Sequence, residues 1–426
     1  MRALRHLWHD TASGLPATFW YLWAGLLINR AGAFAMLFLP LYLTDARGAS
    51  ESLAGTVVGA YGAGGAAGVL LGGVLADRWG RRATLLAAHL ATAALMVALA
   101  FSRPLLLIAV LSALVGVVHS MPSPAFVAAI VDVVPAERRS RAFNLQFWAF
   151  NLGMAVAALL AGVLAQASFT ALFLVDAGAT LTAAAVIGLK VPETLRRTAD
   201  GRTPTPSTPM AIRPRRPGLH TALTDRTFLV FVGLTFVLAV LTMQTSTIMP
   251  LAMRADGLGP SAYGVVVALG GAMIVLGQLF VPRLIDRHRK HVVLAVSTAL
   301  LAVGFGVLAV ADGLGVYLGA AVVWTVGSML AAPPNAQINA DLAPPQLRAR
   351  YQSVFYLTFP AAAFVAPTLG GVSLQHLGDR HWLIVGGLGL LAALGHLLAG
   401  PPRERRVEAL RRTADREPAM DRVPTA

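Results

Sequence analysis

The chain contains no cysteine, and only 13% of its 426 residues are charged. The missing cysteines exclude disulfides, thiolate metal sites and cysteine nucleophiles. So little charge cannot cover the surface of a water-soluble protein of this length. Apolar residues take the place of charge, because 56% of the chain is hydrophobic and the mean hydropathy is +0.67. The composition therefore indicates a membrane protein.

Apolar runs of roughly 20 residues recur along the whole chain, which matches the length a helix needs to cross about 30 Å of hydrocarbon. Irregular backbone cannot face lipid, so each run must be a helix. We predict an all-α membrane protein with twelve transmembrane helices, which begin near Thr18, Leu53, Ala83, Pro104, Ala142, Phe169, Phe228, Ser261, His291, Leu314, Arg350 and His381.

The basic residues alternate from one predicted loop to the next. The N-terminus, every second loop and the C-terminus hold 29 of the 34 Lys and Arg residues, whereas the opposite loops hold four and one lies inside a span. The positive-inside rule then predicts that both termini and the central loop are cytoplasmic. The net charge of +14 is thus a topology signal with some affinity for anionic lipid, and we expect no nucleic-acid partner.

Two motifs recur 209 residues later in the chain. The first is the run GGVLADRWGRR, and the second surrounds Asp132. The matching residues are Asp77, Arg78 and Arg81 with Asp286, Arg287 and Lys290, and Asp132, Pro135, Arg139 and Arg141 with Asp341, Pro344, Arg348 and Arg350. A constant offset at two separate motifs indicates one membrane module written twice, which is typical of two-halved transporters.

The repeat predicts two pseudo-symmetric six-helix halves at residues 1–190 and 227–400. Between them, residues 191–226 are rich in Pro, Arg and Thr, a composition that favours a flexible cytoplasmic linker. Residues 401–426 form a cytoplasmic tail whose Arg and Glu content is compatible with a short surface helix. In such a repeat we expect substrate to bind near the membrane midplane between the halves.

The first motif resembles the signature of the major facilitator superfamily, which lies between the second and third helices. The matching residues are Gly73, Leu75, Ala76, Asp77, Arg78, Gly80, Arg81 and Arg82. The resemblance covers almost the whole chain and implies the twelve-helix fold of that family, with transport by alternating access. It also implies that Asp77 and its arginines latch the cytoplasmic gate, with Asp286, Arg287, Lys290 and Asp341 as the counterpart in the second half.

Physical roles follow for several motif residues. Gly73 would allow a neighbouring helix to approach closely, and Gly80 would allow a tight turn. Asp77 can cap amides or pair with Arg81 or Arg78, and Asp132 is a second carboxylate within reach of those arginines. The alternative is that the arginines only fix the membrane topology.

The resemblance extends to the twelve-helix drug:proton antiporter branch, with two departures. Members of that branch usually carry an arginine within the fourth helix, where His119 is the only basic residue at depth in this chain. They also tend to carry a Gly-Pro pair in the fifth helix, where this chain has Asn151, Leu152 and Gly153.

Arg30 lies near the middle of the first predicted span, beside Asn29. An arginine there costs about 2.5–3.5 kcal/mol, so it must find a partner in protein or in a wet cavity. The expected partner is Asp176 in the sixth span, through a structural ion pair. An unpaired Asp176 would instead be a candidate proton carrier.

His119 is a further candidate for proton coupling, because an imidazole exchanges protons near physiological pH. A lone histidine in a helix is more often a satisfied interior group. Other polar residues at depth are candidates for binding substrate, and each is as readily a hydrogen-bonding contact between helices. They include Gln146, Gln244, Asn335 and Tyr356.

Two transport hypotheses remain open. The first is proton-coupled export of amphipathic drug-like or secondary-metabolite molecules. The second is uptake or facilitated diffusion of a small organic anion or metabolite, with Arg30 at the binding site. No metalloprotease, serine-hydrolase or phosphate-loop motif occurs in the sequence, so we expect neither an enzyme nor a cofactor or metal. We expect a monomer in a bacterial inner (plasma) membrane.

Overall fold

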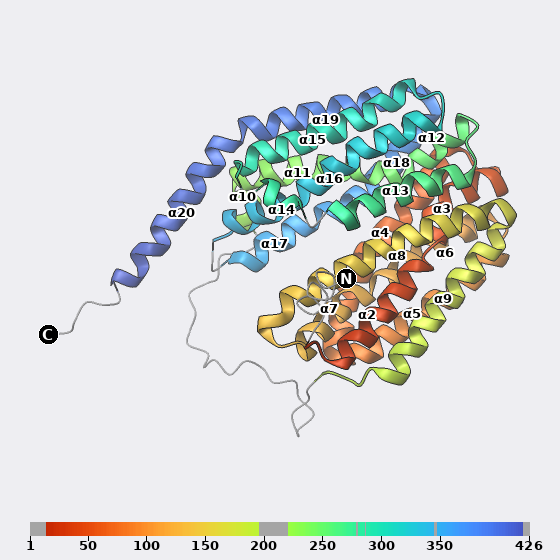
Figure 1. Ribbon diagram of the computed structural model, residues 1–426, viewed down its shortest axis with the longest axis horizontal. Helices are drawn as coiled ribbons and strands as arrows, with labels where there is room; N and C mark the ends of the chain where they lie inside the picture. The colour runs from red at the N-terminus through yellow and green to blue at the C-terminus, as the bar shows by residue number, and fades with distance from the viewer. Residues whose placement is uncertain (1–13, 196–219, 278–279, 286, 345–346, 421–426) are drawn as a thin grey trace, which may run out of the picture. The chain divides into compact units, whose positions relative to one another are not determined.

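The computed structural model describes residues 14–195, 220–277, 280–285, 287–344 and 347–420. These ranges are helical and contain no strand. Their elements are α2 (Ala17–Ala31), α3 (Ala35–Leu41), η1 (Tyr42–Ala46), α4 (Glu51–Arg78), α5 (Arg81–Phe101), α6 (Leu105–Ser120), α7 (Pro122–Val133), η2 (Ala136–Arg138), α8 (Arg139–Ala167), α9 (Phe169–Lys190), α10 (His220–Thr224), α11 (Arg226–Thr247), α12 (Met249–Ala255), α13 (Pro260–Gly277), α14 (Val281–Ile285), α15 (Lys290–Gly306), η3 (Val307–Val310), α16 (Leu314–Leu342), α17 (Arg348–Tyr356), α18 (Thr358–Leu377), α19 (Arg380–Leu398) and α20 (Gly400–Met420) (Figure 1).

Twelve helical segments within the described ranges are long and apolar enough to cross a membrane. Each begins within two residues of its predicted start, which confirms the predicted spans. In chain order, spans 1 to 12 are Ala17–Ala46, Glu51–Arg78, Arg81–Phe101, Leu105–Val133, Arg141–Ala167, Phe169–Lys190, Arg226–Thr247, Pro260–Gly277, Lys290–Val310, Leu314–Leu342, Arg350–Leu377 and Arg380–Leu398.

The chain folds into two compact units. Unit 1 contains Met1–Ala211, Thr245–Val275 and Pro367–His376, and unit 2 contains Ile212–Gln244, Leu276–Ala366 and Leu377–Ala426. This grouping does not coincide with the predicted halves, linker and tail, whose boundaries stay predictions. Most of the predicted linker, residues 196–219, lies outside the described residues.

Span 1 is a broken helix. Helix α2 ends at Ala31, and α3 begins four residues later at Ala35. The first amides of α3 have no acceptor within their own helix. The backbone amide of Ala35 instead donates to Oδ2 of Asp176 in α9, at 3.1 Å. An acid from span 6 therefore caps the second half of span 1.

Helices α4 and α6 touch backbone to backbone through glycines of α4. A Cβ atom added at Gly68 would overlap the carbonyl oxygen of Val117, and one at Gly72 would overlap that of Met121. A Cβ atom at Gly73 would meet no neighbouring atom. The predicted close approach at Gly73 was therefore wrong by one residue, because Gly72 shares the helix face of Gly68 and Gly73 is turned about 100° away from it.

An apolar core lies beside the motif that joins α4 and α5. Phe19 and Leu22 of α2 pack there with Leu85 of α5, Ile130 of α7 and Ile187 of α9, all nearly fully buried. In a membrane such packing gains van der Waals contact rather than release of water. The core holds the ends of these helices in register where the motif residues emerge.

In unit 2, the predicted tail begins as helix α20, directly after α19. Arg403 is 3% exposed and folds back on α19, because its Nε donates to the carbonyl of Ala399 at 2.9 Å and its Nη2 to that of His396 at 2.7 Å. Burial lowers the pKa of Arg403 to about 10, although neighbouring Glu404 acts in the opposite sense. The guanidinium thus caps the carboxyl-terminal end of α19.

Candidate functional site

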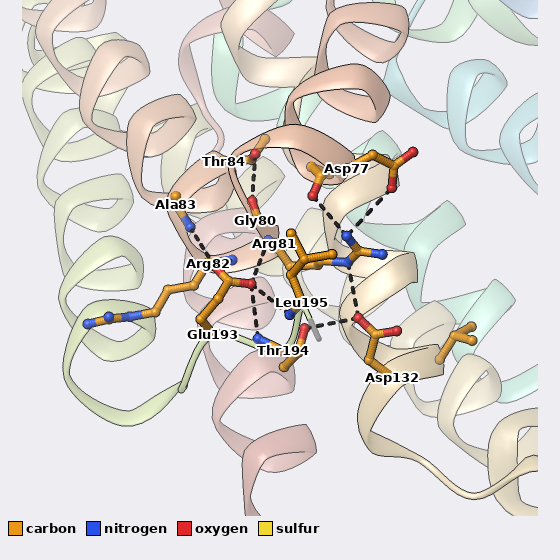
Figure 2. A network of polar contacts seen from close by, with 12 residues as sticks. Asp77, Gly80, Arg81, Arg82, Ala83, Thr84, Asp132, Glu193, Thr194 and Leu195 are labelled. Atoms are coloured by element: carbon orange, nitrogen blue, oxygen red, sulfur yellow. Dashed lines mark hydrogen bonds and ion pairs between the residues drawn. The ribbon is translucent and has the colours of Figure 1, made fainter. Parts of the chain in front are cut away.

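Arg81 lies between two carboxylates at the junction of α4 and α5 (Figure 2). Its Nη1 is 3.5 Å from Oδ1 of Asp77, four residues earlier near the end of α4, and its Nε is 3.0 Å from Oδ2 of Asp132 at the end of α7. Nη1 also donates to the carbonyl of Ala76 at 2.9 Å. The Arg81 side chain is only 14% exposed, whereas that of Asp77 is 76% exposed. The predicted reach of Asp132 to the motif arginines is confirmed, and we call Asp77, Arg81 and Asp132 the gate cluster after its predicted role.

Gly80 provides the turn that starts α5. Its φ of 118° lies in the region that residues with a side chain rarely adopt, which confirms the predicted need for glycine. As N-cap residue it has no side chain to bind the first amides of α5. A Cβ atom here would also overlap the carboxylate of Glu193.

Glu193 supplies the missing cap from the segment that follows α9. Its Oε1 accepts from the amide of Arg81 at 2.8 Å, and its Oε2 accepts from those of Arg82 at 3.1 Å and Ala83 at 3.4 Å (Figure 2). A negative carboxylate at a helix N-terminus is also favoured by the helix dipole. In addition, the Arg82 guanidinium donates to the carbonyl of Gly188 near the end of α9.

Thr194 contacts the other side of the gate cluster. Its hydroxyl donates to Oδ2 of Asp132 at 3.1 Å, the same oxygen that Arg81 approaches (Figure 2). Sequence reasoning missed both Glu193 and Thr194, because they lie at the start of a segment whose composition indicates a linker. The one sequence signal that could have found them is their position directly after the apolar run of span 6, which places them close to the membrane surface.

The counterpart in the second half is simpler. Nζ of Lys290, at the start of α15, is 2.8 Å from Oδ2 of Asp341, at the end of α16. This ion pair matches Arg81 with Asp132, as the repeat predicts. Arg287 is exposed, and Asp286 lies outside the described residues.

Within the membrane, Arg30 at the end of α2 contacts side chains of two other spans. Its Nη1 is 3.2 Å from Nε2 of His119 in α6, and its guanidinium carbon is 5.0 Å from the ring centre of Phe150 in α8. Tyr61 of α4 stands beside His119, with the ring centres 6.4 Å apart. Sequence reasoning named Arg30 and His119 but missed Tyr61, since a tyrosine in an apolar span carries no signal of its own.

The predicted ion pair between Arg30 and Asp176 was wrong, because none joins them among the described side chains. Asp176 is 2% exposed and serves the break in span 1 by accepting from the Ala35 amide. Its Oδ1 accepts from the hydroxyl of Thr180 at 3.4 Å, and that hydroxyl accepts from Nδ2 of Asn29 at 3.3 Å. Asp176 therefore binds a main-chain amide at the break in span 1, rather than the guanidinium of Arg30.

The remaining polar candidates are Gln146 in unit 1 and Gln244, Asn335 and Tyr356 in unit 2. In unit 2, the Gln244 amide oxygen is 3.4 Å from Nε2 of His381, and Asn335 accepts from the Thr235 hydroxyl at 3.0 Å. Both pairs join different helices, which matches the alternative of hydrogen-bonding contacts. Gln146 is half-buried on α8, and Tyr356 is exposed on α17 beside Phe355 and Phe359.

A groove of about 430 Å³ runs beside the gate cluster between α4 and α7. Arg81 and Asp132 form its polar edge, and the rest of its lining is mostly small and apolar: Val69, Ser123, Pro124, Val127, Ala128 and Val131. The gate cluster is thus open to one side of unit 1 rather than enclosed.

The family model described as Major Facilitator Superfamily matches residues 22–331 and 234–421, which together cover most of the chain. The chain belongs to this superfamily. The motif agrees with that membership, as do the twelve spans and the helical fold of the described residues. It is therefore a membrane transporter of a family that moves small molecules.

Several curated relatives align over most of their length. The uncharacterised MFS-type transporter YttB of Bacillus subtilis is 27% identical over 86% of this chain and 90% of its own. Multidrug resistance protein MdtH of Aeromonas hydrophila is 25% identical over 88% and 93%. A Na(+), Li(+), K(+)/H(+) antiporter of Planococcus maritimus is 24% identical over 78% and 83%.

Among solved structures, a POT family transporter in complex with a thioalcohol-conjugated peptide aligns with a TM-score of 0.77. It covers 92% of this chain and 98% of its own, at 14% sequence identity. At that identity the likeness shows the fold alone.

Proposed function

We propose that this protein is a proton-coupled exporter of amphipathic drug-like or secondary-metabolite molecules, working by alternating access. The proposal includes a bacterial inner membrane location with both termini cytoplasmic, supported by the distribution of basic residues. Two of its relatives are named for multidrug resistance and for exchange of alkali cations with protons. The gate cluster and its counterpart supply the latches that alternating access requires.

The observation that carries proton coupling is the contact between Arg30 and His119. A guanidinium has only donors, so Nε2 of His119 must be the acceptor, and the neutral ring then carries its proton on Nδ1. A proton arriving at Nε2 removes this acceptor and creates a second cation 3.2 Å from Arg30. Proton binding and the Arg30 contact therefore exclude each other.

This exclusion links a proton to movement between spans. Arg30 belongs to span 1 and His119 to span 4, so losing their contact releases the two spans from each other. In a low-dielectric interior the repulsion between two adjacent cations is large. The expected cycle has His119 protonated when Arg30 swings away and neutral when the contact returns.

Transport by proteoliposomes that hold the purified protein and a pH-sensitive dye tests the proposal, with ethidium as the probe. We expect ethidium-dependent proton flux in the original protein. In His119→Gln, which keeps an acceptor but cannot titrate, we expect ethidium binding without that flux. The matched control is His89→Gln, because His89 is a buried histidine of span 3 whose Nδ1 lies 2.6 Å from the carbonyl oxygen of Leu85 in its own helix.

Ethidium movement without proton flux in the original protein would contradict the antiporter mechanism. Proton flux that persists in His119→Gln would show that the coupled proton does not bind at the contact between Arg30 and His119. Asp176→Asn then becomes the decisive variant, because it removes the ionisable group while keeping one oxygen to accept from Ala35.

A second candidate function is uptake or facilitated diffusion of a small organic anion. It is favoured by the incomplete bonding of Arg30, whose buried Nε lacks a hydrogen-bond partner and whose guanidinium meets no carboxylate in the described part of the chain. The carboxylate of a substrate would complete this bonding with charge-assisted hydrogen bonds. Carboxyfluorescein that crosses the membrane without proton flux, and that Arg30→Gln stops, would favour this function over export.

A further inference from the structure

We propose that Asp225 and Arg406 are positioning residues of α17, the first segment of span 11, so that the tail helix α20 takes part in transport. This inference rests on the transport function proposed above. Tyr356, one of the predicted substrate-binding residues, is the last residue of α17. Contacts between α20 and α17 therefore bear on a residue that we expect to meet the transported molecule.

Span 11 is interrupted where the matching span of the first half is continuous. Helix α17 ends at Tyr356 and α18 begins at Thr358. Pro360 explains the interruption, because proline has no amide hydrogen to donate to the carbonyl four residues earlier, that of Tyr356. Its counterpart 209 residues earlier is Asn151, which lies inside the unbroken helix α8. The backbone hydrogen bonds of span 11 therefore hold α17 less firmly than those of span 5 hold the start of α8.

Asp225 connects three segments of unit 2. It directly precedes α11, and its Oδ1 accepts from the amide of Phe228 in the first turn of that helix, at 3.2 Å. Its Oδ2 accepts from the hydroxyl of Tyr351 in α17 at 2.9 Å and from Nη2 of Arg406 in α20 at 2.6 Å. The starts of spans 7 and 11 and the tail helix thus meet at one carboxylate, whose side chain is only 9% exposed.

Arg406 provides a charged partner for this carboxylate. A hydrogen bond between a guanidinium and a carboxylate is roughly twice as strong as one between neutral groups. The other two donors, a main-chain amide and the Tyr351 hydroxyl, are neutral. Arg406 therefore fixes the direction of Oδ2, and the hydroxyl of Tyr351 binds that oxygen where the arginine holds it.

A row of aromatic rings forms a second connection between α20 and α17. The guanidinium carbon of Arg403 lies 5.7 Å from the ring centre of Phe231 in α11. That ring is stacked on Phe355 of α17, with centres 5.9 Å apart and planes 4° from parallel, and Phe355 in turn contacts the ring of Tyr356 at 5.5 Å. The row leads from the tail helix to the predicted substrate-binding residue.

At the matching positions of the first half this connection is missing. The residues that match Asp225 and Tyr351 in the repeat are Pro16 and Ala142. Pro16 precedes α2 without a side-chain hydrogen bond to it, and alanine has no hydroxyl to donate. The six-helix module thus folds without such a carboxylate, which supports a role in transport over one in folding alone.

Hydrogen–deuterium exchange of the full-length protein in nanodiscs tests the contacts without any substrate. We expect Arg406→Gln to speed exchange of the amides of residues 352–356 about fivefold, since α17 loses a contact that a charged hydrogen bond held in place. The same change should add little in a Tyr351→Phe background, because its effect passes through the Tyr351 hydroxyl. The matched control is Arg405→Gln, which removes the exposed neighbouring arginine of α20. Unchanged exchange in Arg406→Gln, or equal speeding in both backgrounds, would overturn the proposal.

The transport arm begins with a mild change, Tyr351→Phe, which removes one hydroxyl and keeps the ring that packs against Phe228, with ring centres 4.4 Å apart. We expect the KM for ethidium to rise about threefold with little change in the maximal rate, because Tyr356 shifts relative to the bound ethidium. Arg406→Gln should raise KM equally, and Arg406→Lys, which keeps the charge, should restore most of it. If the contacts only stabilise the fold, Tyr351→Phe and Arg406→Gln would lower the thermal midpoint and leave KM unchanged, which would overturn the proposal. An equal rise of KM in Arg405→Gln would overturn it as well.

Failure of the proposed function gives a different pattern. If the original protein moves no ethidium, the export proposal falls, and the exchange measurements alone decide the positioning role. Coupling between Arg406 and Tyr351 in exchange then supports that role, and independent effects of the two substitutions overturn it.

Discussion

The third spans of the two halves, α5 and α15, begin at matching positions of the repeat and are held in different ways. Gly80 precedes α5 with a φ of 118°, whereas Arg289, 209 residues later, precedes α15 with an ordinary φ of −64°. Arg81 is 14% exposed and lies between two carboxylates, while Lys290 is 42% exposed beside Asp341. The two halves thus differ in the burial of the cation and in the number of its carboxylate partners, whereas Asp132 and Asp341 are about equally exposed.

The difference between the two helix starts shows that only the first half needs a glycine before its third span. In the first half, Glu193 fills the space beside Gly80 and binds the amides of α5. In the second half, Glu404 reaches the side chain of His291 instead, so the residue before α15 needs no special backbone conformation. Three comparisons between the halves test this asymmetry.

The largest effect is expected at Arg81. Arg81→Gln removes two carboxylate contacts and weakens the hydrogen bond to Ala76. We expect the ethidium export rate to fall about a hundredfold, equivalent to about 2.7 kcal/mol, because both ion-pair contacts of the guanidinium are lost. Lys290→Gln, the matched control, should lower the rate less than about fivefold. Equal losses of export rate in the two variants would show that Arg81 and Lys290 contribute equally to transport.

An intermediate effect is expected at Gly80. Gly80→Ala places a methyl group against Glu193 and forces alanine into a strained conformation, at a cost of about 2 kcal/mol. We expect the apparent thermal midpoint in detergent to drop by about 5 °C. Arg289→Ala should change stability by no more than about 0.5 kcal/mol. A Gly80→Ala protein as stable as the original would mean that Glu193 moves aside at no cost.

The smallest effect is expected at the exposed ion pair of the second half. Lys290→Met should cost about 0.5 kcal/mol of stability in dilute buffer. This cost should vanish in 1 M KCl, where the screening length falls to about 3 Å. The stability loss of Arg81→Gln should largely survive the same salt, because its side chain is mostly shielded from solvent. Equal salt sensitivity of the two losses would remove the distinction between the shielded Arg81 and the more exposed Lys290.

The sequence was sufficient to predict the spans, because hydrocarbon requires long apolar helices whatever their tertiary contacts. It also predicted the approach of Arg81 to Asp132, since the resemblance brings the ends of spans 2 and 4 together. The pairing of Lys290 with Asp341 then followed from the repeat. These predictions rest on length, pattern and symmetry, which are properties of the sequence itself.

Predictions that depend on backbone hydrogen bonds were weaker. The partner of Asp176 is the Ala35 amide, which the break in span 1 leaves without an acceptor in its own helix. No pattern of side chains in the sequence predicts such an amide. Glu193 caps a helix that lies 112 residues earlier in the chain, so no local capping rule reveals it. The glycine at the α4–α6 contact was misplaced by one residue, because several neighbouring glycines offered the same signal.

The glycine contact between α4 and α6 has a mechanical consequence. At Gly68 the backbone of α4 lies directly against the backbone of α6 at Val117, with no side chain of Gly68 between them. So close a contact leaves little room for the two helices to move independently, and His119 lies at the end of α6 and Asp77 near the end of α4. In the cycle proposed above, a displacement of His119 on protonation would therefore move α4 and Asp77 together with α6, and a methyl group at Gly68 would weaken this transmission by forcing the two helices apart.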